Sequence, residues 1–204
     1  MRICMIGAGY VGLVSGACFA DFGHQVACID KDASRIGMLN RGEIPIFEPG
    51  LPDLVADNMR QGRLEFAAEA ARVKSAEAVF IAVGTPSRRG DGHADLSFVY
   101  EAVREIAPFL ADATVVVTKS TVPVGTGDEI ERILREKRRN AELQVASNPE
   151  FLREGAAIQD FKHPDRIVVG TDDARARSVL AEIYRPLYLY APPLLYVGRR
   201  TAEL

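Results

Sequence analysis

Hydrophobic residues along the chain alternate between short unbroken runs and longer segments in which they recur at every third or fourth position. Short runs bounded by turn residues predict buried strands, whereas the longer spacing predicts helices with one apolar face. Strands are expected at Arg2–Ile6, Gln25–Ile29, Ala78–Val83, Thr114–Thr118, Leu143–Ser147 and Arg166–Val169, with a weaker one near Leu64–Phe66.

The segments between these strands have helical periodicity. Besides a first helix after Gly12, helices are expected at Asp32–Arg41, Leu51–Gln61, Leu96–Leu110, Asp128–Arg139 and Asp173–Tyr184. Thr126 and Glu129 have the spacing of a capping box at one helix start. Strands that alternate with helices build βαβ units. The sequence therefore predicts an α/β fold, a doubly wound, Rossmann-like parallel sheet with helices on both faces.

The connections and the end of the chain add to this picture. Residues 42–50 and 84–95 form long loops rich in glycine and proline, and residues 191–193 predict a surface turn before a last short strand. Arg199–Leu204 looks like the opening of a helix capped by Thr201. One turn is too short to be stable alone, so we expect a truncated protein.

Composition and charge exclude several kinds of partner. The 204 residues, 48% hydrophobic and 26% charged, suit one globular core. Lys and Arg number 25 against 28 Asp and Glu, spread along the chain, so no basic surface is expected for nucleic acid or anionic lipid. No apolar run approaches the length of about 20 residues that a membrane span needs. We expect small-molecule partners.

The thiols and imidazoles suggest no reactive centre. Cys4, Cys18 and Cys28 have no CxxC spacing and no cationic neighbour, which indicates buried, inert, reduced thiols in a cytoplasmic protein. The three histidines are scattered without metal-ligand spacing, so they are interpreted as surface or packing residues. No metal site is predicted.

Gly7, Gly9 and Gly12 form a GxGxxG motif between the first predicted strand and helix. In a dinucleotide site the first glycine permits the tight turn, the second lets the backbone approach the pyrophosphate, and the third lets helix and strand pack closely. One alternative is a glycine-rich turn that binds nothing. Another is a cleavable signal peptide, because Arg2 precedes a mostly apolar run that ends in small residues.

Asp30 ends the second predicted strand, eighteen residues after Gly12. This is near the spacing of about 20 residues expected for the acid that binds the adenosine ribose. Its negative charge would repel a 2′-phosphate and therefore favours NAD over NADP. Lys31 and Arg35 weaken this inference, because nearby cations tolerate a phosphate.

Two further segments follow predicted strands, whose carboxyl ends line the ligand crevice of an open parallel sheet. Thr85, between Gly84 and Pro86, is expected to face the cofactor, unless the glycine and proline only turn the chain. The segment Lys119–Pro123 offers three hydrogen-bonding side chains, more than a turn needs. A solvated loop is the alternative there.

The segment Asn148–Glu154 is the most unusual, because Glu150 and Glu154 flank the apolar pair Phe151 and Leu152. The apolar pair is expected to pull the loop inward, and a carboxylate held against apolar surface becomes a usable acid or base near neutral pH. If the segment opens a helix, both carboxylates lie on one face, one turn apart. The alternative is a charged first turn that the helix dipole favours.

With these motifs the chain resembles the UDP-glucose/GDP-mannose dehydrogenase family, whose NAD-dependent members oxidise a sugar 6-hydroxyl to a carboxylate in two steps. The resemblance covers the whole chain. It rests on GAGYVGL at 7–13, PIFEPGL at 45–51, VGTP at 83–86, ADLS at 94–97, KSTVPVGT at 119–126, NPEFLREG at 148–155 and HPDRIVVG at 163–170. The last two blocks, with RRTAEL at 199–204, resemble the UDP-glucose branch more than the GDP-mannose or N-acetylmannosamine branches.

The resemblance implies roles for individual residues. NAD would be bound by Gly7, Gly9, Tyr10, Val11, Gly12, Asp30, Arg35, Gly84, Thr85, Pro86, Ser120, Thr121 and Glu154. The sugar nucleotide, UDP-glucose, would be held by Glu150, Phe151, Leu152, Arg153 and Glu154. Thr121 and Glu150 would manage the catalytic water and the proton, and Glu154, the third residue of this catalytic set, would lie beside the cofactor.

The chain also departs from the family pattern. The family uses a lysine, an asparagine and a nucleophilic cysteine downstream of the stretch that matches RRTAEL, and none of them is present. The resemblance thus implies an NAD-binding domain at 1–198 and the start of a truncated central helix at 199–204, without the C-terminal UDP-sugar domain. We expect this fragment to be inactive and the intact cytoplasmic enzyme to be a homodimer or larger homo-oligomer. A GDP-mannose or UDP-N-acetylmannosamine dehydrogenase, or a non-catalytic NAD-binding sensor, are the alternatives.

Overall fold

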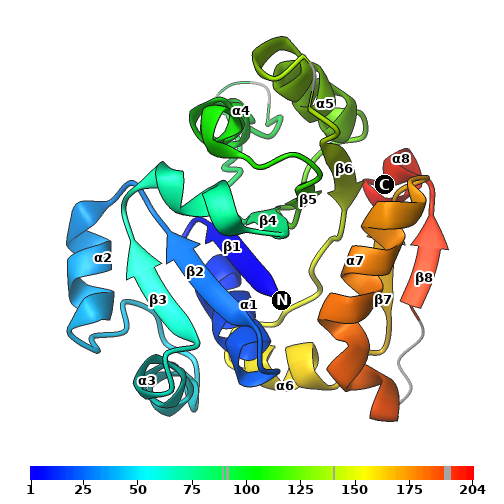
Figure 1. Ribbon diagram of the computed structural model, residues 1–204. Helices are drawn as coiled ribbons and strands as arrows, with labels where there is room; N and C mark the ends of the chain where they lie inside the picture. The colour runs from blue at the N-terminus through cyan, green and yellow to red at the C-terminus, as the bar shows by residue number, and fades with distance from the viewer. Residues whose placement is uncertain (89, 91, 140, 191–193) are drawn as a thin grey trace.

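The structure is a computed structural model that describes residues 1–88, 90, 92–139, 141–190 and 194–204 (Figure 1). One sheet has the strand order β3-β2-β1-β4-β5-β6-β7-β8. Its strands are β1 (Arg2–Ile6), β2 (Gln25–Ile29), β3 (Leu64–Ala67), β4 (Ala78–Ile81), β5 (Val115–Thr118), β6 (Gln144–Ser147), β7 (Ile167–Gly170) and β8 (Leu194–Val197). Every predicted strand is present, and the predicted turn at 191–193 lies outside the described residues.

The sheet is parallel, as predicted, except at one junction. β7 pairs with β6 in the antiparallel direction, through Ser147 opposite Gly170 alone, and β8 then pairs with β7 in parallel. Because the two strands meet at their last residues, β7 begins beyond the edge at which β6 ends. The connection between them, residues 148–166, therefore needs no full crossover, and its helix α6 (Ala157–Lys162) is short.

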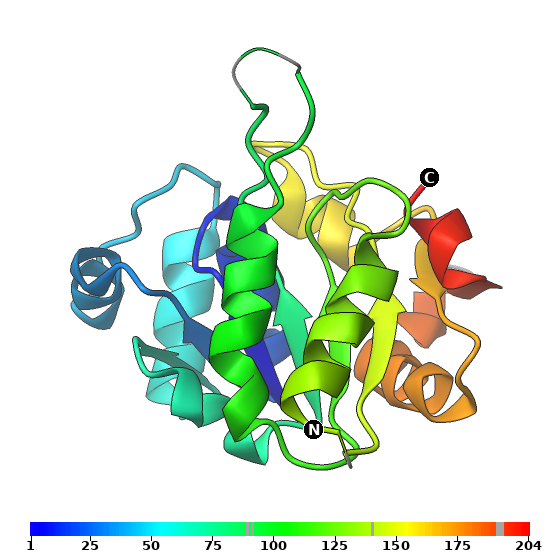
Figure 2. The same ribbon diagram turned by 90° about the horizontal axis from the view of Figure 1, so that it is seen from above.

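Helices cover both faces of the sheet, as predicted (Figure 2). One layer contains α1 (Tyr10–Asp21), α3 (Leu51–Arg60), α6 and α7 (Ala174–Tyr184), and the other contains η1 (Ala70–Ser75), α4 (Ser97–Ile106), η2 (Ala107–Phe109) and α5 (Thr126–Lys137). Helix α2 (Ala33–Asn40) lies beside β3, and η3 (Arg185–Tyr190) continues α7. In β4, Phe80 packs into the first layer and Val79 into the second, so burial on both faces explains its unbroken apolar sequence.

Two predicted helix caps are wrong, and one remote residue explains the first. Helix α5 begins after Gly125, whose φ is +94°, and the Thr126 hydroxyl donates to the Pro123 carbonyl instead of forming a capping box. The amides of Gly125 and Gly127 donate to the Glu203 carboxylate, each at 2.7 Å. Helix α8 (Arg199–Ala202) begins after Gly198, so Thr201 lies inside it and caps nothing.

The last turn of the chain is docked rather than free. Arg199 contacts the carboxylates of Asp128 and Glu131 on α5, and Ala202 lies over Gly170 so closely that a Cβ on this glycine would be 2.3 Å from the alanine Cβ. Tertiary contacts therefore stabilise a helix too short to persist by itself.

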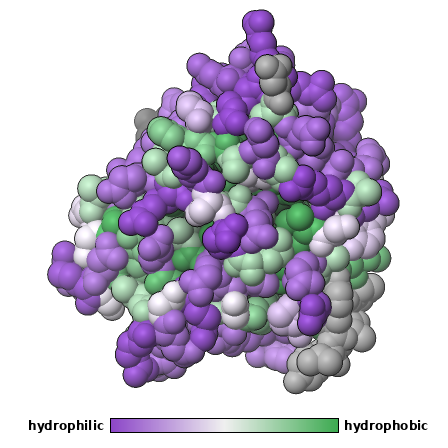
Figure 3. Space-filling model, viewed as in Figure 1, coloured by the Kyte–Doolittle hydropathy of each residue, from purple (hydrophilic) through white to green (hydrophobic). Residues whose placement is uncertain are grey.

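The surface agrees with the composition. Figure 3 shows a face that is mostly hydrophilic, with hydrophobic residues in small separate patches. None of the helices at described positions has the length and apolar character needed to span a bilayer.

Candidate functional site

The strand order reverses between β1 and β4, and a cavity of about 480 Å³ opens at this point. Crevices at such a reversal bind ligands in open α/β sheets. We call it the switch-point cavity. Its walls come from the ends of β1, β2 and β4 and from one face of α4, and its lining includes Gly7, Gly9, Asp30, Arg35, Gly84 and Pro86.

The three motif glycines serve two different purposes. Gly7 has a φ of +102°, and a Cβ there would lie 2.6 Å from the Ala82 carbonyl oxygen. A Cβ on Gly12 would lie 1.9 Å from the Gly7 carbonyl oxygen. Gly9 is the N-cap of α1, and no heavy atom lies within 4 Å of a Cβ placed on it. Gly7 and Gly12 thus permit close backbone packing, while Gly9 leaves room for a group to approach the amides of α1.

Asp30 is held in place at the rim of this cavity. Its Oδ2 accepts hydrogen bonds from the Ala8 amide at 2.8 Å and from Arg35 Nη1 at 2.9 Å, and its Oδ1 accepts from the Asp32 amide at 2.9 Å. The carboxylate therefore has a fixed orientation beside the glycine turn. Arg35 is committed to this carboxylate rather than left as an isolated cation.

The segments that follow β4 and β5 lie side by side, as the order of predicted strands led us to expect. The Thr85 hydroxyl donates to the Thr121 carbonyl at 3.0 Å, and the Ser120 hydroxyl donates to the Val83 carbonyl at 2.6 Å. The Ser120 side chain is buried in this contact, whereas Thr121 is exposed. Thr121 is therefore the member of this pair that can meet a ligand from solvent.

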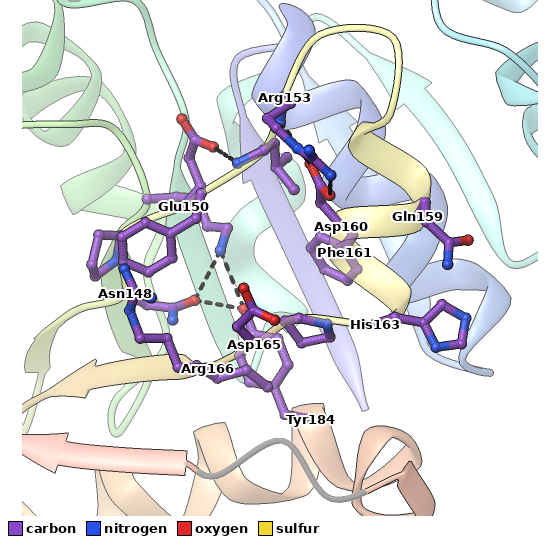
Figure 4. A pocket seen from close by; sticks show the side chains of 16 residues that line it. Asn148, Glu150, Arg153, Gln159, Asp160, Phe161, His163, Asp165, Arg166 and Tyr184 are labelled. Carbon is purple, nitrogen blue, oxygen red and sulfur yellow. Dashed lines mark hydrogen bonds and ion pairs between the residues drawn. The ribbon is translucent and has the colours of Figure 1, made fainter.

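A second cavity of about 500 Å³, the loop cavity, lies under residues 149–153 and is shown in Figure 4. The Glu150 carboxylate accepts a hydrogen bond from the Leu152 amide at 2.6 Å, and Arg153 forms two side-chain hydrogen bonds with Asp160 at 2.7 and 3.0 Å. Phe151 also lines the cavity, with the Arg166 guanidinium 4.5 Å from its ring centre.

The helix that the sequence allowed over residues 148–154 is absent. Residues 148–156 form loop and turn, and α6 begins only at Ala157, so Glu150 and Glu154 share no helix face. Pro149 disfavours a helical Asn148, and Gly155 has a left-handed φ of +84°, which ends any regular turn before α6. Glu154 is exposed and lines neither cavity.

Lys119 lies in the wall of the loop cavity and is buried. Its amine donates to Asn148 Oδ1 at 3.2 Å and to the Tyr184 hydroxyl at 3.3 Å, and that hydroxyl donates to the same Asn148 oxygen at 2.6 Å (Figure 4). Burial lowers the pKa of Lys119 to about 8, and the charge of Glu150 opposes the shift. The cluster thus places a buried amine with a lowered pKa in the wall of the same cavity that Glu150 lines.

Comparison with known proteins decides the family. A profile described as "UDP-glucose/GDP-mannose dehydrogenase family, NAD binding domain" matches residues 1–188. The chain belongs to this family. It is 66% identical to the UDP-glucose 6-dehydrogenase of Rhizobium meliloti over 207 aligned residues, which include all of this chain and 47% of that protein. The chain spans about half the length of the relatives it matches.

Two solved structures of the family give the same result. A UDP-glucose dehydrogenase from Pyrobaculum islandicum aligns with 99% of this chain and 47% of its own, at 41% identity and a TM-score of 0.93. A GDP-mannose dehydrogenase from Pseudomonas aeruginosa, solved as a ternary complex, covers all of this chain and 48% of its own, at 34% identity and the same TM-score. The predicted fold, family and NAD cofactor are confirmed.

The residue roles taken from the family resemblance remain predictions, and the geometry sorts them into groups. Six of the cofactor residues line the switch-point cavity, and Glu150 to Arg153 line the loop cavity. Outside both linings are Tyr10, Val11, Gly12, Thr85, Ser120, Thr121 and Glu154. The Tyr10 hydroxyl donates to Glu48, so this hydroxyl already has a partner within the protein.

Sequence reasoning missed Lys119, although it noted the segment in which Lys119 lies. The available signal is a lysine directly after an apolar strand that is buried on both faces. Asn148 follows β6 in the same way. Tyr184 carries no such signal, because its spacing from Leu180 and Leu187 is that of an ordinary core helix.

Proposed function

We propose that this chain is the NAD-binding half of a UDP-glucose 6-dehydrogenase, which oxidises UDP-glucose to UDP-glucuronate in two NAD-dependent steps. Sequence identity supports this proposal. The chain is 66% identical to a UDP-glucose 6-dehydrogenase over its whole length, but only 34% identical to a GDP-mannose dehydrogenase of nearly the same backbone. We keep residues 1–198 as the cofactor domain and 199–204 as the start of a connecting helix.

The residues of the switch-point cavity fit a dinucleotide. The open space at Gly9 admits a pyrophosphate to the amides of α1, and the fixed Asp30 carboxylate accepts hydrogen bonds from ribose hydroxyls. Its charge beside this position disfavours a 2′-phosphate, so we propose NAD rather than NADP. When bound, NAD supplies a hydride acceptor.

The loop residues would manage substrate and proton. We propose that Phe151, Leu152 and Arg153 hold the sugar nucleotide, since they line the loop cavity beside Glu150. A carboxylate such as Glu150 is suited to accept the proton of the hydroxyl or water, with Thr121 as its hydrogen-bonding partner for the water. Glu154, exposed at the end of this loop, would lie beside the cofactor.

The thiols of this chain do not supply the nucleophile that the family uses. Burial raises the pKa of Cys4 and of Cys18 to about 12, and raises the pKa of Cys28 further. All three are free and buried. We therefore propose that these 204 residues alone form no NADH from UDP-glucose. Unpaired thiols are usual in cytoplasmic proteins, and we keep that location and a homo-oligomeric enzyme as proposals.

Calorimetric titration of the chain with NAD, and separately with NADP, tests the cofactor proposal. We expect NAD to bind and NADP to be excluded, and a folded sample that binds neither would contradict the assignment. Fusion to the C-terminal half of the Rhizobium meliloti relative tests the substrate. That fusion should form NADH with UDP-glucose and not with GDP-mannose, whereas NAD binding without turnover of either sugar would favour the sensor alternative.

A further inference from the structure

The segment that joins α2 to α3 reverses the usual arrangement of polar and apolar side chains. Phe47 is 85% exposed, whereas the next residue, Glu48, is only 4% exposed. An exposed phenyl ring is common in proteins, but a buried carboxylate is rare and persists only with strong partners. The burial of Glu48 therefore needs an explanation that its own segment does not give.

The Glu48 carboxylate binds two other segments at once. Its Oε2 accepts hydrogen bonds from the Tyr10 hydroxyl and from the Gly155 amide, the latter at 2.9 Å, and its Oε1 accepts from the Ile158 amide at 3.3 Å. Tyr10 is the first residue of α1, directly after the glycine-rich turn, and the two amides belong to the loop before α6 and to the first turn of α6. Residues separated by more than 100 positions thus meet on one side chain.

Tyr10 completes the cluster. Its oxygen also accepts from the Gly155 amide at 3.1 Å, and its hydroxyl lies 3.4 Å from the Arg153 carbonyl oxygen. Burial and the hydrogen bond to Glu48 raise the pKa of Tyr10 to about 12, so this hydroxyl remains a donor throughout the neutral range. Tyr10 and Glu48 together hold the loop from two directions.

Both ends of this cluster adjoin proposed ligand positions. Tyr10 is the first residue of α1 and directly follows Gly9, beside which a pyrophosphate has room. Gly155, the turn residue with a φ of +84°, directly follows Glu154. A shift of the helix start therefore moves the loop, and a shift of the loop moves the helix start.

We propose that Glu48 is a positioning residue, which fixes the loop 150–155 against the dinucleotide turn and so couples NAD binding to the placement of Glu150 and Glu154. The inference rests on the proposed function of these two segments. Coupling between two sites is reciprocal: a loop held by Glu48 raises the affinity for NAD, and bound NAD steadies the loop.

Hydrogen–deuterium exchange of the 204-residue chain, with and without NAD, tests this proposal. In the unsubstituted chain, NAD should slow exchange of residues 153–158 by about fivefold or more. Glu48→Gln replaces one acceptor oxygen by an NH₂ donor at constant shape. It should raise exchange in 153–158 without NAD, abolish most of the NAD-dependent slowing, and weaken NAD binding by about fivefold.

Two further variants keep the test decisive. Tyr10→Phe removes the link to the turn but leaves Glu48 with its two amides, so it should lose the NAD-dependent slowing even if Glu48→Gln does not fold. Glu43→Gln is the matched control, because Glu43 lies in the same segment and pairs with Arg41 at the surface. It should behave as the unsubstituted chain.

The outcomes separate the two proposals. Normal NAD affinity together with unchanged exchange in folded Glu48→Gln and Tyr10→Phe would overturn the positioning role and leave the proposed function intact. Failure of the unsubstituted chain to bind NAD would overturn both the cofactor assignment and the coupling.

Discussion

Arg35 donates a hydrogen bond at 2.9 Å to the same Asp30 oxygen that accepts from the Ala8 amide, at the rim of the switch-point cavity. Asp30→Ala removes the group that would bind the ribose and releases the Arg35 cation. We expect NAD affinity to fall about tenfold, which is about 1.4 kcal/mol, and NADP affinity to rise. Calorimetric titration with both nucleotides measures this. Asp57→Asn, on the exposed face of α3, is the control, and unchanged discrimination in Asp30→Ala would contradict the prediction.

The two kinds of motif glycine predict opposite phenotypes for the same substitution. In Gly12→Ala the new methyl group meets the Gly7 carbonyl, so the free energy of unfolding should fall by roughly 3 kcal/mol. In Gly9→Ala the methyl group meets no protein atom, so stability should change by about 1 kcal/mol or less. NAD affinity should nevertheless fall in Gly9→Ala, because the methyl group occupies the approach to the amides. Urea unfolding and NAD titration distinguish them, and equal destabilisation of both variants would count against this reading.

The lowered pKa of Lys119 predicts that the free energy of unfolding rises with pH. Its pKa falls from an ordinary 10.5 to about 8 in the folded chain, so between these values the unfolded state binds more protons at this site. The destabilisation is complete below about pH 8 and is relieved as pH rises toward 10.5. Its size is on the order of 3 kcal/mol. Urea unfolding from pH 7 to pH 10 should show this rise in the unsubstituted chain relative to Lys119→Met, whereas parallel curves would refute the lowered pKa.

The buried thiols predict low chemical reactivity. A pKa of about 12 for Cys4 and Cys18 leaves a thiolate fraction at pH 8 about 1,000-fold below that of an ordinary cysteine. Iodoacetamide should therefore modify none of the three cysteines in the native chain within an hour, and all three in denaturant. Mass spectrometry counts the added groups, and rapid native labelling of any cysteine would show an exposed or activated thiol.

Much of the fold could be predicted because sheet burial leaves a strong trace in the sequence. Parallel strands such as β4 and β5 are covered on both faces, so they are unbroken apolar runs that a linear pattern reveals. The direction of β7 could not be predicted in this way, since Ile167 to Val169 has the same hydrophobic pattern in either direction. The start of α5 was predicted wrongly because its partner is remote in sequence: the Glu203 carboxylate accepts hydrogen bonds from the amides of Gly125 and Gly127.

In the candidate site, too, residues with a local sequence signal could be predicted and residues with remote partners could not. The place of Gly7, Gly9 and Asp30 at the switch-point cavity could be predicted, because the glycine turn and the acidic residue after the second strand follow a short and regular spacing. Glu48 and Lys119 could not, because their partners are 107 and 65 positions away and meet them only once the strand order is known. Local sequence therefore indicates where a candidate ligand site lies, whereas contacts between distant segments become visible only in the folded chain.

The contact of Glu203 with the start of α5 also has a mechanical meaning. Two hydrogen bonds of 2.7 Å join the last turn of the chain to Gly125 and Gly127, and Gly125 lies four residues after Thr121. The Glu203 carboxylate therefore ties the last turn of the chain to the start of α5, which follows the segment 119–123. Displacement of the last turn would thus be felt near Thr121, although 83 positions separate Thr121 from Leu204.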